Sequence, residues 1–456
     1  MPSPMLVIHD EVSNQRNLVP SRAGLTDSTT RFTRRDATAA RLNVSWAFRG
    51  YKDVVTMEPT TGAPSTKRTA MAVAVLFFVN GMVFSNWLPR IPEVRDRLGL
   101  GNAGLGATLL GGGLGGIVGS VLVGRVAGRL GSRRLLMLAA GALSIGLPLI
   151  GFAPEALALL LVLSALGMLD VFNDVAMNAQ GVIVQQRLQR SIMNRLHAMW
   201  SLGFTAGAVI GSAAAAAEIG VRVHLVVVGA ILLTTVVVMQ RWLIPIDPPP
   251  NAASERARSG SSRHISKIVV VTAFAALAAA SLETTPNDWA AVLMDDVFDA
   301  GRLSGFGTVA AAGAMLVGRL GGDHVLDRIG ERRLMVGALC LSGVGALVTV
   351  VAPVAAIALV GLVVWGLGLS VVFPQLYATA ARLPGTTAGA GLGSMLLGQR
   401  LGGMLAAVSV GSLAEWHDLR VAFAVVSLVA LAILAATVRR MTSTRQLRVD
   451  DERSST

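Results

Sequence analysis

The sequence reads GRVAGRLGSRR over residues 124–134 and DHVLDRIGERR over residues 323–333. The two stretches form a repeat, because Gly131 and Gly330 are 199 positions apart (330 − 131 = 199). The same offset relates further pairs, namely Gly119 and Gly318, Gly146 and Gly345, Pro154 and Pro353, Gly167 and Gly366, and Gly203 and Gly402. Because all these pairs share the offset of 199 residues, the sequence predicts two related halves. Each half has a short basic turn between long apolar runs.

The composition predicts a membrane protein. Hydrophobic residues make up 53% of the 456 residues and charged residues only 14%, and the mean hydropathy is +0.62. A soluble domain carries about a quarter charged residues. The charges here lie in narrow bands separated by apolar stretches of about twenty residues, the length that crosses a hydrocarbon core of ~30 Å.

Several other classes of function are disfavoured. The net charge of +12 does not indicate a nucleic-acid partner, because the arginines lie between apolar runs. The lone Cys340 sits in an apolar stretch, so we expect neither a disulfide framework nor a metal site. The glycine run at 111–116 lacks the Gly-Lys-Ser/Thr ending of a P-loop, which argues against ATP-driven transport. We expect no enzyme activity and no cofactor.

Twelve apolar runs follow one another after residue 68, six on each side of a polar connector. The first six are 69–89, 102–124, 135–153, 155–180, 195–217 and 222–243, and the second six are 267–289, 302–322, 334–352, 354–379, 388–412 and 419–438. We therefore expect an all-α membrane protein of twelve helices arranged as two six-helix repeats. The expected parts are a disordered N-terminal tail (1–67), a first bundle (68–244), a linker (245–266), a second bundle (267–440) and a C-terminal tail (441–456).

Arginine placement predicts the orientation in the membrane. Alternate loops are rich in arginine, including the two repeated turns, while the opposite loops hold fewer arginines accompanied by acids. The positive-inside rule therefore predicts that both repeated turns, the linker and both tails lie in the cytoplasm.

The repeated turn resembles the loop signature of the major facilitator superfamily, Gly-x-x-x-Asp-Arg/Lys-x-Gly-x-Arg/Lys-Arg/Lys. The first copy matches it at Gly124, Arg129, Gly131, Arg133 and Arg134. The second copy matches it at Asp327, Arg328, Gly330, Arg332 and Arg333. The first copy has Gly128 in place of the aspartate, and the second has Asp323 in place of the leading glycine.

The resemblance covers the chain after residue 68 and implies a multi-pass transporter of a bacterial inner membrane. Parallel six-helix repeats are typical of this superfamily. Within it the sequence is similar to the YbjJ-like bacterial branch, distantly related to fucose-permease-type transporters. Three blocks carry this similarity, at 87–92, at 174–180 with 197–203, and at 283–289. In the family the loop helps to lock the cytoplasmic side. The residues expected to form the cytoplasmic gate are Arg129, Gly131, Arg133, Arg134, Asp174, Asn178, His197, Asp327, Arg328, Gly330, Arg332 and Arg333.

The fourth span carries a polar stripe, because Asp170, Asp174 and Asn178 recur every four residues with Asn173 beside them. A carboxylate at the membrane centre costs roughly 2.5–3.5 kcal/mol on insertion scales, so the stripe must face a cavity or a partner. Asp170 either couples solute movement to a proton or forms a structural ion pair. For Asp174 we favour an ion pair with a loop arginine such as Arg129 or Arg133. His197 either relays protons or bonds a polar group of the fourth span.

The seventh span contains Glu283-Thr-Thr-Pro-Asn-Asp-Trp289, and Pro286 is expected to interrupt that helix. Glu283 is the first candidate for proton coupling, with a gate role beside Arg90 as the alternative. Trp87 and Trp289 either stack on a ligand or anchor the membrane interface. The candidates for solute binding and proton coupling are Asn80, Trp87, Asp170, Asn173, Glu283, Asn287, Asp288 and Trp289.

The leading functional hypothesis is a monomeric secondary transporter that moves a small, sugar-like polar solute together with a proton. It would work by alternating access between two halves. A drug or metabolite efflux antiporter is the alternative, disfavoured because only 5% of the residues are aromatic. A non-transporting membrane sensor is the alternative from another class.

Overall fold

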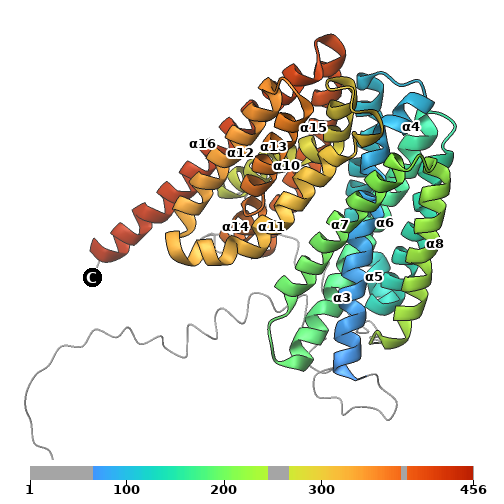
Figure 1. The fold of residues 1–456 in the computed structure, drawn as a ribbon. Coiled ribbons are helices and arrows are strands. Elements are labelled where there is room, and N and C mark those ends of the chain that lie inside the picture. Colours follow the sequence, from blue (N-terminus) through green and yellow to red (C-terminus); the bar gives the residue numbers. More distant parts are fainter. Residues whose placement is uncertain (1–64, 245–266, 382–387, 455–456) are drawn as a thin grey trace, which may run out of the picture. The chain divides into compact units, whose positions relative to one another are not determined.

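The structure is a computed structural model that describes residues 65–244, 267–381 and 388–454. The expected linker and the expected N-terminal tail up to residue 64 lie outside the described residues. The first half contains, in order, α3 (Thr66–Ser85), η2 (Leu88–Arg90), α4 (Ile91–Arg97), α5 (Asn102–Phe152), α6 (Ala156–Leu188), α7 (Met193–Ala216), α8 (Val221–Met239) and η3 (Gln240–Trp242). Figure 1 shows these elements from blue to yellow-green.

The second half is also helical throughout its described residues. It contains α10 (Lys267–Asp296), η4 (Gly301–Leu303), α11 (Phe306–Ile329), α12 (Glu331–Val351), α13 (Ala355–Leu369), α14 (Val372–Ala381), α15 (Ala388–Trp416) and α16 (Leu419–Ser454). These elements run from yellow to red in Figure 1.

The helices supply twelve membrane crossings. Eleven helical segments of the described chain are long and apolar enough to cross a membrane. One of them, Asn102–Phe152, has 51 residues and a non-helical residue inside, Gly131, so it comprises two crossings. The expected six-plus-six arrangement is confirmed.

The two repeated turns have the same backbone conformation. Gly131 has φ 72° and ψ 164°, and Gly330 has φ 79° and ψ 161°. This region of φ and ψ is essentially restricted to glycine, because a Cβ would clash with the backbone. Both glycines reverse the chain between two crossings. We call the end of the molecule that carries these turns the turn end, and the opposite end the far end.

The 199-residue offset also holds in the packing. A Cβ on Gly203 would collide with the carbonyl oxygen of Phe78, and a Cβ on Gly402 with that of Leu277, which is the residue 199 positions after Phe78. Glycine allows this close backbone approach between helices, as small residues commonly do in membranes. The repeat therefore encodes equivalent close contacts, α7 on α3 and α15 on α10.

Arginines close equivalent helix ends at the far end. Arg97 donates to the carbonyl oxygens of Ile150 and Gly151 at the end of α5. Arg420 donates to those of Val350 (2.7 Å) and Ala352 (2.6 Å) at the end of α12. The last carbonyls of a helix have no partner within the helix, so these guanidinium groups satisfy them.

The helices differ from the expected ones at three places. α10 continues through Pro286, so the expected interruption of the seventh span is wrong. A transmembrane helix tolerates proline when neighbouring groups and local adjustments satisfy the freed backbone. The tenth span instead divides into α13 and α14 at residues 370–371. α16 extends to Ser454, through most of the expected C-terminal tail.

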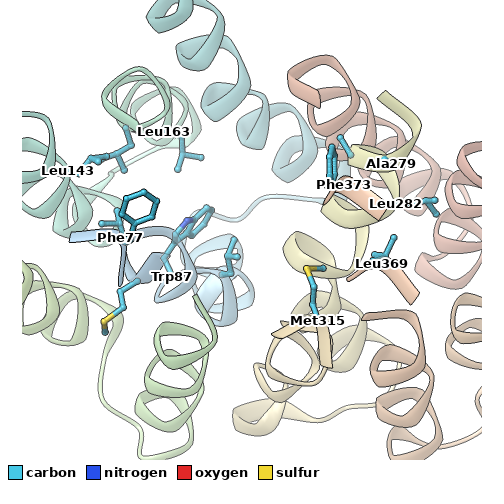
Figure 2. Close-up of a cluster of buried hydrophobic side chains, with 14 of the residues drawn as sticks. Phe77, Trp87, Leu143, Leu163, Ala279, Leu282, Met315, Leu369 and Phe373 are labelled. Carbon is cyan, nitrogen blue, oxygen red and sulfur yellow. The ribbon is translucent and has the colours of Figure 1, made fainter. Parts of the chain in front are cut away.

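Apolar side chains cover the outside of the bundles as well as the inside. Leu428, Leu320 and Val121 are 67 to 70% exposed in the absence of lipid. Monomeric soluble proteins rarely expose large contiguous apolar patches, whereas a bilayer favours them. Figure 2 shows part of the buried core, with Phe77, Trp87 and Leu143 among the labelled side chains.

The turn conformation predicts the effect of a single methyl group. Gly330→Ala should destabilise the protein by roughly 1–3 kcal/mol, because alanine must adopt the positive φ of Gly330. Gly337→Ala is the matched control, since Gly337 lies in α12 with open space around its Cα and an ordinary helical backbone. Thermal unfolding in detergent should show a lower Tm for Gly330→Ala only. Equal Tm values for the two variants would contradict this explanation.

Candidate functional site

Charged groups join the two halves at the far end. Arg95 of α4 donates two hydrogen bonds to Asp296 of α10, at 2.6 and 2.8 Å. Arg302 pairs with Glu218 across the same interface. The Arg95–Asp296 pair is forked, a geometry found among the stronger polar contacts in proteins.

Close helix packing continues this contact toward the middle of the molecule. Along α5 and α15, a Cβ on Gly106 would meet the Ala407 carbonyl oxygen, and a Cβ on Gly113 would meet the side chain of Met404. Along α7 and α11, the Thr205 hydroxyl donates to the Ala312 carbonyl oxygen at 3.4 Å. The halves are therefore in contact from the far end down to a layer of polar side chains.

The first polar chain in this layer runs through three helices of the first half to the second half. The Trp200 indole Nε1 donates to Asn80 Oδ1 at 2.8 Å. Asn80 Nδ2 donates to Asp170 Oδ1 at 3.2 Å. The other carboxylate oxygen of Asp170 lies 3.8 Å from Arg400 Nη2 of α15. Asn80 is only 5% exposed, and it satisfies both its neighbours, as a buried amide must.

The second polar group centres on Arg319 of α11. Its Nη1 donates to the Ser201 hydroxyl of α7 at 3.0 Å, across the two halves. Its Nη2 lies 3.4 Å from Glu283 Oε1 of α10, within its own half. A single guanidinium therefore joins the candidate proton-coupling carboxylate to the opposite half.

A small cavity of about 30 Å³ opens beside Arg319. Its polar wall includes Ser201, Glu283 and Asn287, and its aromatic wall is the pair Trp200 and Phe204. These two rings are stacked, with centroids 5.4 Å apart and planes 29° apart. Asn287 Oδ1 is buried and accepts no hydrogen bond from any described residue. The cavity has room for about one or two water molecules, and its walls present an aromatic face, a cation, a carboxylate and a free acceptor.

The structure brings together only some of the candidates for solute binding. Asn80, Asp170, Glu283 and Asn287 lie in or beside the polar layer. The remaining four, Trp87, Asn173, Asp288 and Trp289, do not line the cavity or join either polar chain.

The two tryptophans are core residues. Trp87 is 3% exposed and Trp289 fully buried, so other side chains cover both rings. Both belong to the buried apolar cluster that contains Phe77, and Figure 2 shows Trp87 and Phe77 in it. Arg90 pairs with Glu93 and not with Glu283, which excludes the alternative gate pairing in this structure.

The expected gate is dispersed at the turn end. Asp174 accepts a hydrogen bond from Asn178 at 2.9 Å, while Arg133 donates to the Gln240 carbonyl oxygen. The expected ion pair of Asp174 with Arg129 or Arg133 is therefore not formed. His197 instead makes an edge-to-face contact with Phe77, centroids 5.4 Å apart. The exposed members that form no ion pair with another described residue are Arg129, Arg134, Asp327, Arg328, Arg332 and Arg333.

Sequence reasoning missed the cations of the site. Arg319 and Arg400 each interrupt an otherwise apolar span, and an ionisable residue inside a membrane span is a functional candidate by default. The positive-inside rule concerns arginines in loops, so it gives no indication of a role for Arg319 or Arg400. Trp200, which orients Asn80, had no signal beyond its aromatic character.

A larger cavity lies elsewhere. A groove of about 920 Å³ runs between α3, α7 and α8 and is lined almost wholly by apolar side chains such as Val79, Ile210 and Val227. Ile210 and Val227 are exposed in the absence of lipid, so this groove faces the bilayer. In the part of the chain that the structure describes, no three His, Cys, Asp or Glu side chains cluster closely enough to hold a metal ion.

Comparison with known proteins identifies the architecture. The family model of the Major Facilitator Superfamily matches residues 73–325 and 302–454. An uncharacterized MFS-type transporter of Yersinia pestis is 27% identical over 385 residues, which cover 82% of this chain and 95% of the relative. Membrane protein MosC of Rhizobium meliloti is 28% identical over 326 residues, 70% of this chain and 77% of the relative.

Solved structures share the fold. The nucleoside transporter NupG superposes with a TM-score of 0.64 at 14% identity, covering 82% of this chain and 99% of NupG. A bacterial homolog of the human lysosomal transporter Spinster, in an inward-facing and unoccupied conformation, superposes with a TM-score of 0.63 at 14% identity, covering 83% of this chain and 98% of its own.

The far-end ion pairs predict how the two halves are held together there. Arg95→Gln should expose the interface beside Ser212, whose buried hydroxyl lies against Gly305 of the other half. The reporter is Ser212→Cys in a Cys340→Ser background, labelled with a water-soluble maleimide. We expect labelling about fivefold faster, the factor for roughly 1 kcal/mol.

Glu155→Gln is the control for this measurement, because Glu155 is exposed at the same end and its side chain does not cap α6. An unchanged labelling rate in Arg95→Gln would show that the Arg95–Asp296 pair does not keep the far end closed.

Proposed function

Because the chain belongs to the Major Facilitator Superfamily, and is therefore a multi-pass membrane transporter and not an enzyme, we propose that it carries a small polar solute together with a proton. The transport cycle is alternating access of the two six-helix halves around the polar layer. The solute is sugar-like, and the working unit is a monomer.

One observation carries this proposal. Arg319 lies between Glu283 of its own half and Ser201 of the other half, at the wall of the cavity. A carboxylate that shares a cation with the opposite half can link protonation to movement, because a neutral carboxyl group no longer attracts the guanidinium. Desolvation strengthens this effect, since charges interact more strongly in a low-dielectric interior than in water.

The contacts between the halves support a state closed toward the outside. Arginine-rich loops mark the turn end as cytoplasmic under the positive-inside rule, so the far end faces outward. The ion pairs and close glycine contacts run from the far end to the polar layer. In this state a solute would reach the site from the cytoplasmic side.

The cavity walls suggest the chemistry of the solute. Stacked Trp200 and Phe204 suit the flat face of a sugar or heterocyclic ring. Glu283 and the free Oδ1 of Asn287 suit hydroxyl or amino donors, and Arg319 suits an acceptor. Monosaccharides and nucleosides both meet these requirements, and the latter are also suggested by the structural likeness to a nucleoside transporter.

A ligand screen is the first test of the proposed function. Monosaccharides, polyols and nucleosides are added to the purified protein, and the binding solute is identified by an increase in Tm, since a ligand of the native state stabilises it by mass action. Uptake of that solute into proteoliposomes should then follow an imposed pH gradient. Binding without uptake, or uptake that ignores the gradient, would refute proton-coupled transport.

Removal of the carboxylate charge tests the coupling residue. Glu283→Gln keeps the shape of the side chain but cannot gain or lose a proton. We expect uptake driven by a pH gradient to fall at least about tenfold, while exchange of internal for external solute persists, because exchange needs no net proton movement. Glu155→Gln serves as the control. If Glu283→Gln retained gradient-driven uptake, Glu283 would not be the coupling group.

A further inference from the structure

Arg400 of the second half contacts the first half, and its side chain is 32% exposed. Its Nη2 lies 3.8 Å from Asp170 Oδ2 of α6. Its side chain also lies flat against Gly116 of α5, where a Cβ would stand 3.1 Å from the Arg400 Cζ and Nε atoms. The guanidinium therefore occupies a socket formed by two helices of the opposite half.

The socket is prepared by groups of the first half alone. Trp200 Nε1 donates to Asn80 Oδ1, so the amide orients its Nδ2 toward Asp170. That hydrogen bond occupies Asp170 Oδ1 and leaves Oδ2 to face Arg400. Because Asn80 is buried and fully engaged, the carboxylate is held in place.

The position of Arg400 along α15 indicates which movement of the helices would break the pair. On the far side of Arg400, Met404 and Ala407 pack against glycines of α5. Arg400 is thus at the inner end of the seam between α5 and α15. A movement of the far end that also separates α15 from α6 at this level breaks the Asp170–Arg400 pair.

The pair has no counterpart at the equivalent positions of the repeat. Arg400 corresponds to Ser201 (400 − 199 = 201), and Asp170 corresponds to Leu369 (170 + 199 = 369). Ser201 itself accepts a hydrogen bond from Arg319. Both halves share the same helix packing. In this charge pair, however, the carboxylate comes only from the first half and the arginine only from the second.

We propose that Arg400 is a positioning residue that latches the two halves in the observed state, and that its release from Asp170 permits the far end to open. In this proposal Arg400 and Gly116 have roles that the proposed transport of a solute with a proton does not require. Asp174 of the same helix is the other carboxylate within electrostatic range of both Asp170 and Arg400.

A double-mutant cycle tests the latch in the full chain without any solute. Asp170→Asn, Arg400→Gln and the double variant are built in the Ser212→Cys, Cys340→Ser background and labelled with maleimide in proteoliposomes. Each single variant should label about fivefold faster than the parent, and the double variant no faster than either single one, because all three lack the same pair. Arg400→Lys should restore slow labelling in part, since it returns the positive charge.

Gly116→Val provides a second route that leaves both charges in place. Its side chain would displace Arg400 from the socket, and labelling should accelerate as in Arg400→Gln. Arg195→Gln and Glu155→Gln are controls for loss of an exposed charge.

Three results would overturn the proposal: unchanged labelling in the single variants, additive effects in the double variant, or equally fast labelling of Arg400→Lys and Arg400→Gln. None of these results depends on solute uptake, so a failure of the latch is distinguishable from a failure of the transport proposal.

Discussion

Charge pairing in a low-dielectric interior is the constraint on which the middle of this protein depends. Arg319 and Arg400 lie within helices that cross the membrane, where an isolated charge is costly. Each is held near a carboxylate, Glu283 and Asp170 respectively. Since Arg400 and its carboxylate come from different halves, satisfying the charges also joins the halves. The site and the interface between the halves are therefore one structural feature.

The helical framework around this layer obeys the repeat. Glycines at equivalent positions allow equivalent backbone contacts, as Gly203 with Phe78 and Gly402 with Leu277 show. Lipid provides little hydrophobic force between helices, so close packing of this kind stabilises the bundle. The same glycines would make a rigid unit of each half, which is what movement of one half against the other requires.

The polar layer departs from the repeat at the positions that matter for chemistry. The residues 199 positions after Asn80 and Asp170 are Ala279 and Leu369. Both halves therefore use one fold, while the first half contributes a carboxylate with its orienting amide and the second half contributes the cations. A solute bound between them meets two different surfaces, and this asymmetry supports selective recognition.

The sequence by itself determined the twelve crossings, the duplication and the glycine turns, because these follow from apolar length, a constant offset and the φ angle that only glycine adopts freely. It also identified Asp170 and Glu283, since acids inside apolar spans are conspicuous. Only the tertiary structure decided their partners. Arg319 is 36 positions from Glu283, and Arg400 is 230 positions from Asp170 (400 − 170 = 230). Contacts between such distant segments depend on how helices pack, which local spacing does not specify.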